Sequence, residues 1–169
     1  MIYTTIIQSP LGPLVAGVIA NEICLLEFDD PHLLDTQRLM LERLFNCPVL
    51  PGEQPLHHVL RTQLDQYFSG ERQELSLPLV NPGSDFQQRV WGSLLQIPYG
   101  STRSYEEIAC QIGAPRAVRA VGTANGRNRL AILIPCHRVV NKDGKLGGYG
   151  GGLWRKQWLL ELEQRFAGA

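Results

Sequence analysis

Apolar runs separated by turn signals dominate the first part of the chain and predict strands that are followed by helices. The three β-rich runs are residues 2–8, 14–19 and 23–28. Their short connections indicate a small antiparallel meander. Apolar residues then recur at helical spacing over residues 33–45 and 56–68, and a further strand is predicted over residues 75–80. This order predicts a small α/β domain with an antiparallel sheet.

The remainder of the chain has mainly helical patterns. An apolar stripe runs over residues 86–95, and the last helix is predicted at residues 154–166. Between them, Ser104 and Glu107 form a capping-box pattern that begins a short helix, and a proline suits the first turn of the next helix, residues 115–124. Two short helices joined by a glycine-containing turn are typical of a helix-turn-helix motif, and also of an ordinary helical hairpin, which is the commoner structure.

Three features separate this motif from the last helix. Residues 130–134 are an apolar run that is interpreted as a buried strand, and a proline follows it. Residues 139–146 combine a Val-Val pair with an Asn-Lys-Asp-Gly turn, which predicts a tight basic hairpin or wing. Residues 147–152 include five glycines and are too glycine-rich for a strand or a helix.

The tetrapeptide Asn-Pro-Gly-Ser at residues 81–84 breaks the chain, so we predict two domains, residues 1–82 and 83–169. Charge changes at the same place. The chain of 169 residues has 16 basic and 16 acidic residues in total. The first 84 residues have four basic and ten acidic groups (net −6), and the rest have twelve and six (net +6). A basic half is typical of a protein that binds an anion such as nucleic acid, although ordinary solvated surface gives the same count.

Several classes of protein are disfavoured by composition. No stretch approaches the roughly 20 apolar residues that span a bilayer, and the N-terminus has no basic or apolar signal segment. The four cysteines are widely spaced and form no Cys-x-x-Cys pair, which argues against a disulfide framework or a tetrathiolate zinc site. Free cysteines indicate a reducing compartment, so we expect a cytoplasmic protein with no membrane partner.

The segment Ile-Pro-Cys-His-Arg-Val-Val, residues 134–140, is the strongest candidate for chemistry. A thiol becomes a strong nucleophile when a base takes its proton or a positive field lowers its pKa. His137 is suited to be that base, directly or through a water molecule, and Arg138 adds positive potential. A histidine base needs a third group to hold its tautomer, and Glu161 and Glu163 are the candidate carboxylates. A lone cysteine beside a strand is more often a buried hydrophobic residue, so local chemistry leaves both interpretations open.

This segment resembles the active-site signature of the O6-alkylguanine-DNA alkyltransferases of bacterial type, also called methylated-DNA–protein-cysteine methyltransferases. Other segments resemble the family in the same order and spacing, over residues 86–91, 97–100, 104–105, 116–122, 147–152 and 158–163. The resemblance is strong over residues 84–165 and weaker but consistent over the N-terminal half. It implies an α+β fold, in which a small ribonuclease H-like α/β domain precedes a mainly helical, winged helix-turn-helix-like domain that binds DNA and accepts the alkyl group.

The resemblance implies an irreversible, single-turnover DNA repair reaction at Cys136. Its thiol corresponds to the acceptor that takes a methyl or other alkyl group from O6 of guanine in DNA. His137 would deprotonate this thiol through a bound water, and Glu163 would orient His137. Tyr105 corresponds to the tyrosine that donates a proton or hydrogen bond to guanine N3. Asn128 corresponds to the asparagine that bridges the helix-turn-helix and the cysteine loop.

Other positions carry over to DNA binding and to the substrate pocket. Arg119 resembles the arginine finger that enters the base stack where the damaged nucleotide has rotated out. Arg116, Lys142 and Tyr105 are also expected to contact DNA. The expected lining of the pocket consists of Val139, Tyr149, Gly150 and Gly151. Gly150 stands where other members carry a serine, so the accepted adduct size, and activity on O4-alkylthymine, stay open.

The resemblance also implies the partners of the protein. The expected partner is double-stranded DNA that contains alkylated guanine, bound through the minor groove with little sequence preference. We expect a monomer, several copies of which can bind along one DNA. No cofactor is expected. No metal is expected either, because the N-terminal zinc set of some family members has no match among Cys24, Cys47, His32, His57 and His58.

Two other classes of function stay compatible with parts of the pattern. One is a DNA-binding sensor that recognises alkylated guanine without repairing it, although relatives of that kind replace the acceptor cysteine. The other is a Cys–His hydrolase that uses Glu163, for which the sequence has no evident oxyanion-hole motif. Transfer of an alkyl label from DNA to Cys136 distinguishes the three.

Overall fold

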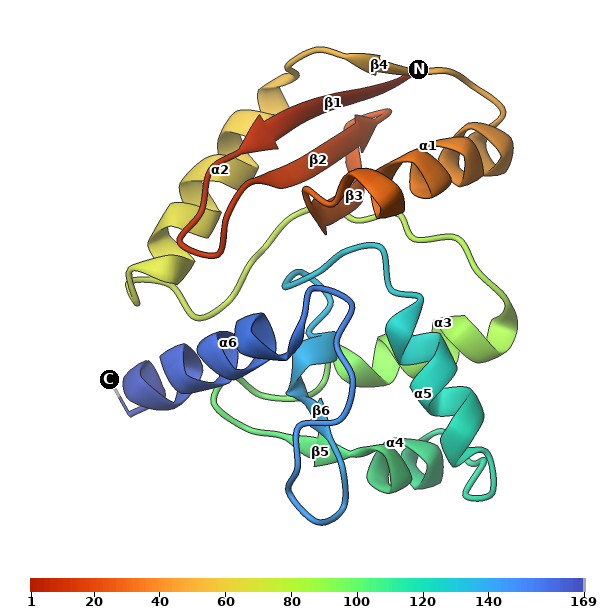
Figure 1. Cartoon of the computed structure of the whole chain (residues 1–169), viewed down its shortest axis with the longest axis vertical. Coiled ribbons are helices and arrows are strands. Elements are labelled where there is room, and N and C mark those ends of the chain that lie inside the picture. Colours follow the sequence, from red (N-terminus) through yellow and green to blue (C-terminus); the bar gives the residue numbers. More distant parts are fainter. Residues whose placement is uncertain (169) are drawn as a thin grey trace. The chain divides into compact units, whose positions relative to one another are not determined.

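Two compact units, Met1–Pro82 and Gly83–Ala169, make up the chain, and each is described by itself. The computed structural model describes residues 1–168, except for the side chains of His32 and Leu33, so the expectation about His32 lies outside the described residues. The first unit is a small sheet with two helices, and the second is mainly helical (Figure 1), which confirms the predicted α+β class. Within residues 1–168, no helix is both long and apolar enough to cross a membrane.

A four-stranded sheet with the strand order β3-β2-β1-β4 organises the first unit. The strands are β1 (Ile2–Ile7), β2 (Leu14–Ile19), β3 (Glu22–Phe28) and β4 (Val49–Pro51). The β1–β2 and β2–β3 pairs are antiparallel, as predicted, but β4 pairs in parallel with β1, so the sheet is mixed. Three residues that end in a proline carry no periodic signal, and β4 was not predicted. The strand predicted over residues 75–80 is wrong, because this segment makes one isolated bridge, from Leu79 to Ile23.

Two residues form the loop that connects β2 and β3. Ala20 and Asn21 both take positive φ, 46° and 62°. A two-residue loop with this backbone has a twist that matches the twist of the flanking strands. Asparagine tolerates the left-handed conformation better than most residues, so the pair forms a tight hairpin in the place that the sequence predicted.

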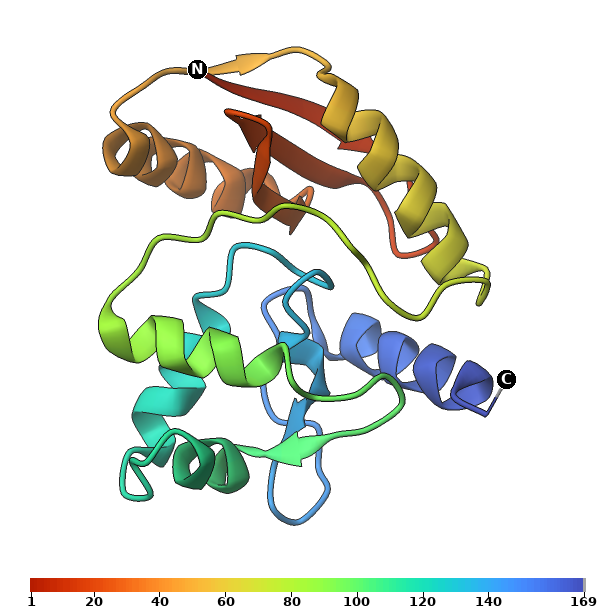
Figure 2. The same cartoon turned by 180° about the vertical axis from the view of Figure 1, so that it is seen from behind.

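Helices α1 (Pro31–Phe45) and α2 (Pro55–Phe68) lie on opposite sides of the sheet (Figures 1 and 2). A core cluster joins the sheet to α1 through Ile2, Cys24, Leu25 and Leu41. The buried face of α2 carries Leu56, His57, Leu60, Leu64 and Tyr67. Both helices occupy the segments that their apolar spacing predicted, with α1 beginning two residues earlier than expected.

The second unit places helices around a two-stranded parallel ladder. Its helices are α3 (Asp85–Leu94), α4 (Tyr105–Gln111), α5 (Val118–Gly126) and α6 (Leu153–Phe166), with a short 3₁₀ helix η1 (Cys136–Arg138). Strand β5 (Arg103–Ser104) pairs with β6 (Val139–Val140). This ladder brings the residues that precede α4 beside the residues that follow η1, although the two segments lie far apart in the sequence.

Side-chain caps define where α3 and α4 begin. Ser84 and Gln87 form a reciprocal capping box at α3. At α4, one of the two hydrogen bonds of the predicted capping box is present: Ser104 Oγ accepts from the backbone N of Glu107 at 3.1 Å. The Glu107 carboxylate instead lies 3.8 Å from Arg103 Nε. These caps satisfy helix N–H groups that have no partner within the helix.

Helices α4 and α5 occupy the predicted helix-turn-helix segment, and three details differ from the prediction. Helix α5 begins at Val118 rather than at Pro115, because residues 114–117 form a turn that is closed by the bond from Ala117 N to Ala114 O. Residues 131–134 form tight turns, and residue 130 makes only a single bridge, so this segment is not a strand. β6 forms the first arm of the predicted hairpin, but residues 145–146 do not form the second.

Candidate active site

Cys136 lies at the start of η1 with 7% of its surface exposed. Two buried amides contact it. Asn128 Nδ2 lies 3.3 Å from Cys136 Sγ, and Asn125 Nδ2 donates to the Cys136 carbonyl oxygen at 3.3 Å. The geometry therefore contains the contact expected of Asn128, and a second contact that comes from α5 itself.

Asn128 also shapes the turns that precede the cysteine. Its Nδ2 donates to Ile134 O at 2.9 Å and to Leu130 O at 3.2 Å, and its Oδ1 accepts from Leu130 N at 3.1 Å. Inside these turns Ile132 takes φ 70°. That backbone is strained for a β-branched residue and persists only when its surroundings enforce it. One amide therefore stabilises a strained turn that leads directly to the candidate nucleophile.

A buried network of His137, Arg138 and Glu163 lies next to the cysteine. His137 Nε2 is 2.8 Å from Glu163 Oε2, and both side chains are almost completely buried. Arg138 donates to both oxygens of the same carboxylate, at 2.7 and 2.9 Å. Of the two carboxylates that the sequence left open, Glu163 is the one bonded to the histidine, whereas Glu161 is exposed. Arg138, expected only to add positive potential, is the ion-pair partner of Glu163.

The protonation states of this network follow from burial and charge. Burial lowers the pKa of His137 by more than its hydrogen bond to Glu163 raises it. Burial alone would raise the pKa of Glu163, but hydrogen bonds and charge from His137 and Arg138 outweigh it and bring that pKa to about 2. The imidazole is therefore neutral and the carboxylate ionised at neutral pH. In that state the Nε2–H of His137 donates to Glu163, and Nδ1 is the acceptor nitrogen.

The Nδ1 atom of His137 is buried and has no hydrogen-bond partner within residues 1–168. A buried acceptor without a donor is destabilising, so a group of this kind calls for a functional explanation. Because Nε2 is committed to Glu163, Nδ1 is the ring atom that can take up a proton. The site therefore combines a thiol, an adjacent base and a carboxylate that sets the tautomer of the base.

Tyr105 begins α4 and contacts the glycine-rich loop of residues 147–152. Burial raises the pKa of Tyr105, negative charge at Cys136 raises it further, and a backbone hydrogen bond with Gly148 lowers it. The phenol therefore keeps its proton at neutral pH and can donate it. The loop approaches closely at Gly147, where φ is 71° and a Cβ would lie 3.0 Å from the Tyr105 hydroxyl. Glycine at this position permits both the left-handed backbone and the close contact.

Lys156 of α6 is fully buried, and its side chain forms hydrogen bonds to the backbone of the same loop. Its Nζ donates to the carbonyl oxygens of Leu146 and Gly148, the second at 3.1 Å, and lies 6.0 Å from the centre of the Tyr105 ring. Burial lowers the pKa of Lys156 to about 8, although Cys136 acts in the opposite direction. The ammonium group thus links the loop to the site.

Lys156 and Asn125 were given no role from the sequence. Lys156 lies on the buried face of α6 with Leu159 and Glu163, at i, i+3 and i+7, and this helical spacing was the signal that could have identified it. Asn125 lies three residues before Asn128, near the end of α5, and its residue type does not distinguish it from an ordinary turn asparagine.

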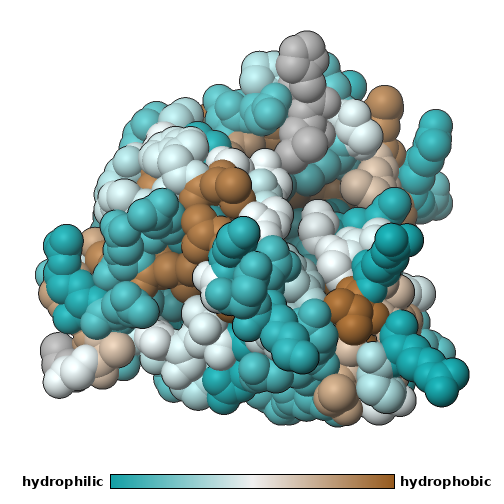
Figure 3. All heavy atoms as spheres, turned by 60° about the horizontal axis from the view of Figure 1, so that its bottom comes forward, coloured by the Kyte–Doolittle hydropathy of each residue, from teal (hydrophilic) through white to brown (hydrophobic). Residues whose placement is uncertain are grey.

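Of the residues expected to meet DNA, Tyr105 is half-buried, and the other three are exposed on the second unit. Arg116 precedes α5, Arg119 lies in its first turn, and Lys142 follows β6; all three are exposed. Hydrophilic side chains predominate on the face that Figure 3 shows. Arg129 is different, because it is 7% exposed and its guanidinium lies 5.7 Å from the centre of the Trp91 ring. Arg129 is therefore not part of the exposed basic surface of this unit.

The residues predicted to line the pocket follow the cysteine in the chain. Val139 is fully buried in β6, directly after η1. Tyr149, Gly150 and Gly151 belong to the glycine-rich loop, which Arg155 also holds by donating to the Gly151 carbonyl oxygen at 2.9 Å. Their role as pocket lining stays a prediction. Among the side chains that the structure describes, which exclude that of His32, no cluster of three or more His, Cys, Asp or Glu is suited to hold a metal ion.

Comparison with known proteins matches both halves of the chain to one family. Residues 85–165 match the family described as 6-O-methylguanine DNA methyltransferase, DNA binding domain. Residues 1–80 match the family described as 6-O-methylguanine DNA methyltransferase, ribonuclease-like domain. Both matches agree with the resemblance that the cysteine segment indicated.

Individual relatives extend this similarity over most of the chain. A methylated-DNA–protein-cysteine methyltransferase of Mycobacterium leprae is 47% identical over 167 residues, which cover 97% of this chain and 93% of that protein. One from Mycobacterium bovis is 63% identical over 107 residues, and this match covers 63% of the chain but only 65% of the length of the relative. The crystal structure of Mycobacterium tuberculosis OGT in complex with DNA matches with a TM-score of 0.84 and 46% identity, covering 97% of this chain and 94% of that one.

Proposed function

The chain belongs to the 6-O-methylguanine DNA methyltransferase family, and on that premise we propose that it repairs DNA by transferring an alkyl group from O6 of guanine to its own Cys136. The arrangement around this buried thiol carries the proposal. The next residue is a histidine whose Nε2 is bonded to Glu163 and whose Nδ1 has no partner within residues 1–168. A thiol inside a protein needs such a base in order to become a nucleophile.

The proposed reaction is a nucleophilic displacement at carbon. His137 Nδ1 takes the thiol proton through one water molecule, and Cys136 Sγ attacks the alkyl carbon. The bond from that carbon to O6 breaks, and its electron pair stays on the guanine. The guanine takes a proton from the Tyr105 hydroxyl at N3, which makes it a better leaving group, and the proton held on His137 restores Tyr105. The products are guanine and an S-alkyl cysteine.

The product accounts for a single turnover. A thioether is not readily hydrolysed, because a thiolate is a poor leaving group from an alkyl carbon attacked by water. Each molecule therefore repairs one lesion and is consumed. The contact between Asn128 Nδ2 and Cys136 Sγ is altered in the process, since the sulfur gains an alkyl group.

Recognition of DNA is assigned to the exposed basic residues of the second unit. Arg119, in the first turn of α5, fills the gap left by a nucleotide that has rotated out of the stack, and Arg116 and Lys142 contact phosphates. Exposed Ala120 and half-buried Gly122 let α5 approach the minor groove closely. Because phosphates and the minor groove carry little sequence information, the protein binds alkylated duplexes with little sequence preference. The Mycobacterium tuberculosis relative in complex with DNA supports DNA as the partner.

The flipped guanine is assigned to a pocket formed by β6 and the glycine-rich loop. Val139 offers its backbone carbonyl to the base, and Tyr149, Gly150 and Gly151 line the space around it. The residues assigned to chemistry all come from one chain, so a monomer suffices, and several copies can bind along one duplex. The reducing cytoplasm keeps the acceptor thiol in its reactive form.

A duplex with a labelled methyl group on one O6-methylguanine tests the proposal. We expect at most one label per protein molecule, located on Cys136 by peptide mass spectrometry. The Cys136→Ala variant is expected to bind the same duplex and take up no label. Binding without transfer by the natural protein would support a sensor instead, and repeated turnover of an ester or amide substrate would support a hydrolase.

A further inference from the structure

Asn125 is a buried polar residue that the proposed mechanism does not use. It lies at the C-terminal end of α5, is 5% exposed, and donates from Nδ2 to the Cys136 carbonyl oxygen at 3.3 Å. Its Oδ1 is buried without a hydrogen-bond partner within residues 1–168. An amide whose NH₂ group is hydrogen-bonded but whose oxygen is buried without a donor lowers the stability of the folded state.

The Cys136 carbonyl does not depend on Asn125 for a partner. The backbone N–H of Val139 also donates to it, at the end of η1. Removing the amide would therefore leave no carbonyl orphaned, and it would remove one orphaned acceptor. Satisfying buried polar groups does not explain the presence of asparagine at this position.

The position of Asn125 along α5 suggests another role. The same helix carries Arg119 near its start, six residues earlier, which corresponds to about 9 Å along a helix axis. The C-terminal end of the helix is anchored to the interior, because Trp91 Nε1 donates to the Ala124 carbonyl oxygen at 2.9 Å. The Asn125 side chain thus makes a direct hydrogen bond from α5, the helix to which we assign DNA binding, to the main chain of the acceptor cysteine.

Asn128 makes a different connection. It follows the end of α5, contacts the Sγ atom of Cys136, and its other bonds go to the turns at residues 130 and 134. Its Nδ2 has two hydrogens for three acceptors, so the contact with sulfur is a shared one. The bond from Asn125 acts on the backbone of the cysteine and therefore on the direction of its side chain, whichever way the sulfur contact is shared.

We propose that Asn125 is a positioning residue that couples α5 to Cys136, so that engagement of α5 by DNA orients the thiol for attack. The inference rests on the proposed function. It predicts that loss of the Asn125 amide slows repair of duplex DNA selectively, because a free base reacts without engaging α5.

The test compares two substrates with one substitution. Asn125→Leu has a similar shape and no polar group. We expect its single-turnover transfer from O6-methylguanine in a saturating duplex to be about tenfold slower, the effect of losing one hydrogen bond in the transition state. Its reaction with free O6-benzylguanine is expected to stay within about twofold of the natural protein, as is its affinity for the duplex. Its urea midpoint should be unchanged or higher, since an orphaned acceptor has been removed.

Two further variants make the result decisive. Gln157→Leu exchanges an exposed amide on α6 for leucine and is expected to leave the rate of transfer from both substrates unchanged. Asn125→Asp keeps the shape but turns an oxygen toward the Cys136 carbonyl, so it should slow the duplex reaction at least as much. It replaces Asn125→Leu in the test if that variant does not fold. Equal losses on both substrates together with lower stability, or an unchanged duplex rate, overturn the inference. If the natural protein does not label Cys136 at all, the proposed function itself fails.

Discussion

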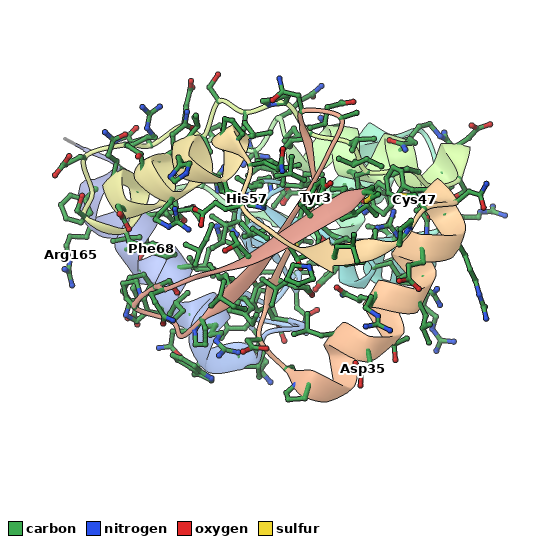
Figure 4. The ribbon with its side chains drawn as sticks, turned by 90° about the horizontal axis from the view of Figure 1, so that it is seen from above. Tyr3, Asp35, Cys47, His57, Phe68 and Arg165 are labelled. Carbon is green, nitrogen blue, oxygen red and sulfur yellow. The ribbon has the colours of Figure 1, made fainter. Side chains whose placement is uncertain are left out.

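Among the histidines whose side chains the structure describes, each unit contains one that is fully buried, and the two have different hydrogen-bond partners. His57, in the first turn of α2 (Figure 4), accepts from Gln54 N at Nδ1 with 2.8 Å, and its Nε2 lies 3.1 Å from Ala16 O. His137, in the second unit, has Glu163 at Nε2 and no partner at Nδ1 within residues 1–168. Burial lowers the pKa of both histidines.

The difference shows that burial and a lowered pKa do not by themselves mark a catalytic histidine. His57 is satisfied on both sides by backbone groups, so its ring ties a helix to a strand and has no free site for a proton. His137 has an acceptor nitrogen on one side and an ionised carboxylate on the other. The carboxylate stabilises the imidazolium that forms when the acceptor nitrogen takes a proton. The partners of the ring therefore decide its role.

The largest expected effect comes from replacing each histidine with leucine. His137→Leu removes the base and is expected to slow alkyl transfer by about 10²–10⁴-fold. His57→Leu leaves two backbone groups without their side-chain partner, so the free energy of unfolding is expected to fall by about 1–3 kcal/mol. The transfer rate of folded His57→Leu should not change. Single-turnover transfer and urea unfolding measure both effects, and a folded but slow His57→Leu protein would contradict the comparison.

The next effect concerns the carboxylate that distinguishes the two histidines. Glu163→Gln removes the charge that orients His137 and leaves the Arg138 charge buried without its counterion. We expect a loss of about 10–100-fold in transfer rate and about 3–5 kcal/mol in stability. Glu161→Gln is the matched control, two residues earlier on the same helix and exposed, and should leave both quantities unchanged. Similar losses in both variants would mean that α6 as a whole, and not this carboxylate, is responsible.

A smaller effect is expected from pH. Both histidines have folded-state pKa values below the ordinary 6.5, so the unfolded chain binds more protons as pH falls below that value, and stability decreases. The slope is at most about 1.4 kcal/mol per pH unit for each histidine. Glu163, with a pKa of about 2, stays ionised through this range.

Urea midpoints between about pH 7 and pH 5.5 measure the effect. The natural protein is expected to lose more stability over this range than His57→Leu does, because the variant lacks one of the two groups that resist protonation. Equal losses in the two proteins would show that His57 does not carry the pH dependence.

The smallest expected effect comes from relieving backbone strain, which differs between the two units. Among the non-glycine residues of the first unit, positive φ occurs at Ala20, Asn21 and Asn46, none of which is β-branched, whereas in the second unit buried Ile132 takes φ 70° close to the acceptor cysteine in the sequence. Ile132→Gly is expected to be more stable than Ile132→Ala by about 1 kcal/mol, because both lose the side chain and only glycine relieves the strain. Thermal unfolding of the pair measures this. Equal stability would mean that the turn is not strained.

Periodicity predicted the elements whose signals are local. Strand β2 and helix α2 lie almost where the apolar spacing and the flanking turn residues indicated. β4 could not be found in this way, because Val49–Pro51 becomes a strand only by pairing with β1, far away in the sequence. Residues 130–134 have the composition of a strand, but Asn128 bonds to their backbone and holds them as turns.

Residue identity and order located the candidate chemistry. The segment of residues 134–140 and its spacing from Tyr105 and Glu163 indicated the family before any geometry was known, and the family matches confirm that resemblance. Residue type alone gives no sign that Arg129 is buried against Trp91 or that Lys156 is buried against the glycine-rich loop. A charged residue normally signals surface, and only its neighbours in space can show otherwise.

By itself, then, the sequence determined the α+β class and the family and indicated candidate residues for the chemistry, because periodicity and residue order are properties of the chain. Only the tertiary structure decided that Glu163 and not Glu161 contacts His137, that Nδ1 is the free side of that ring, and that Asn125 bonds to Cys136. Hydrogen-bond partners and burial arise from contacts between segments far apart in the sequence, and no local pattern encodes them.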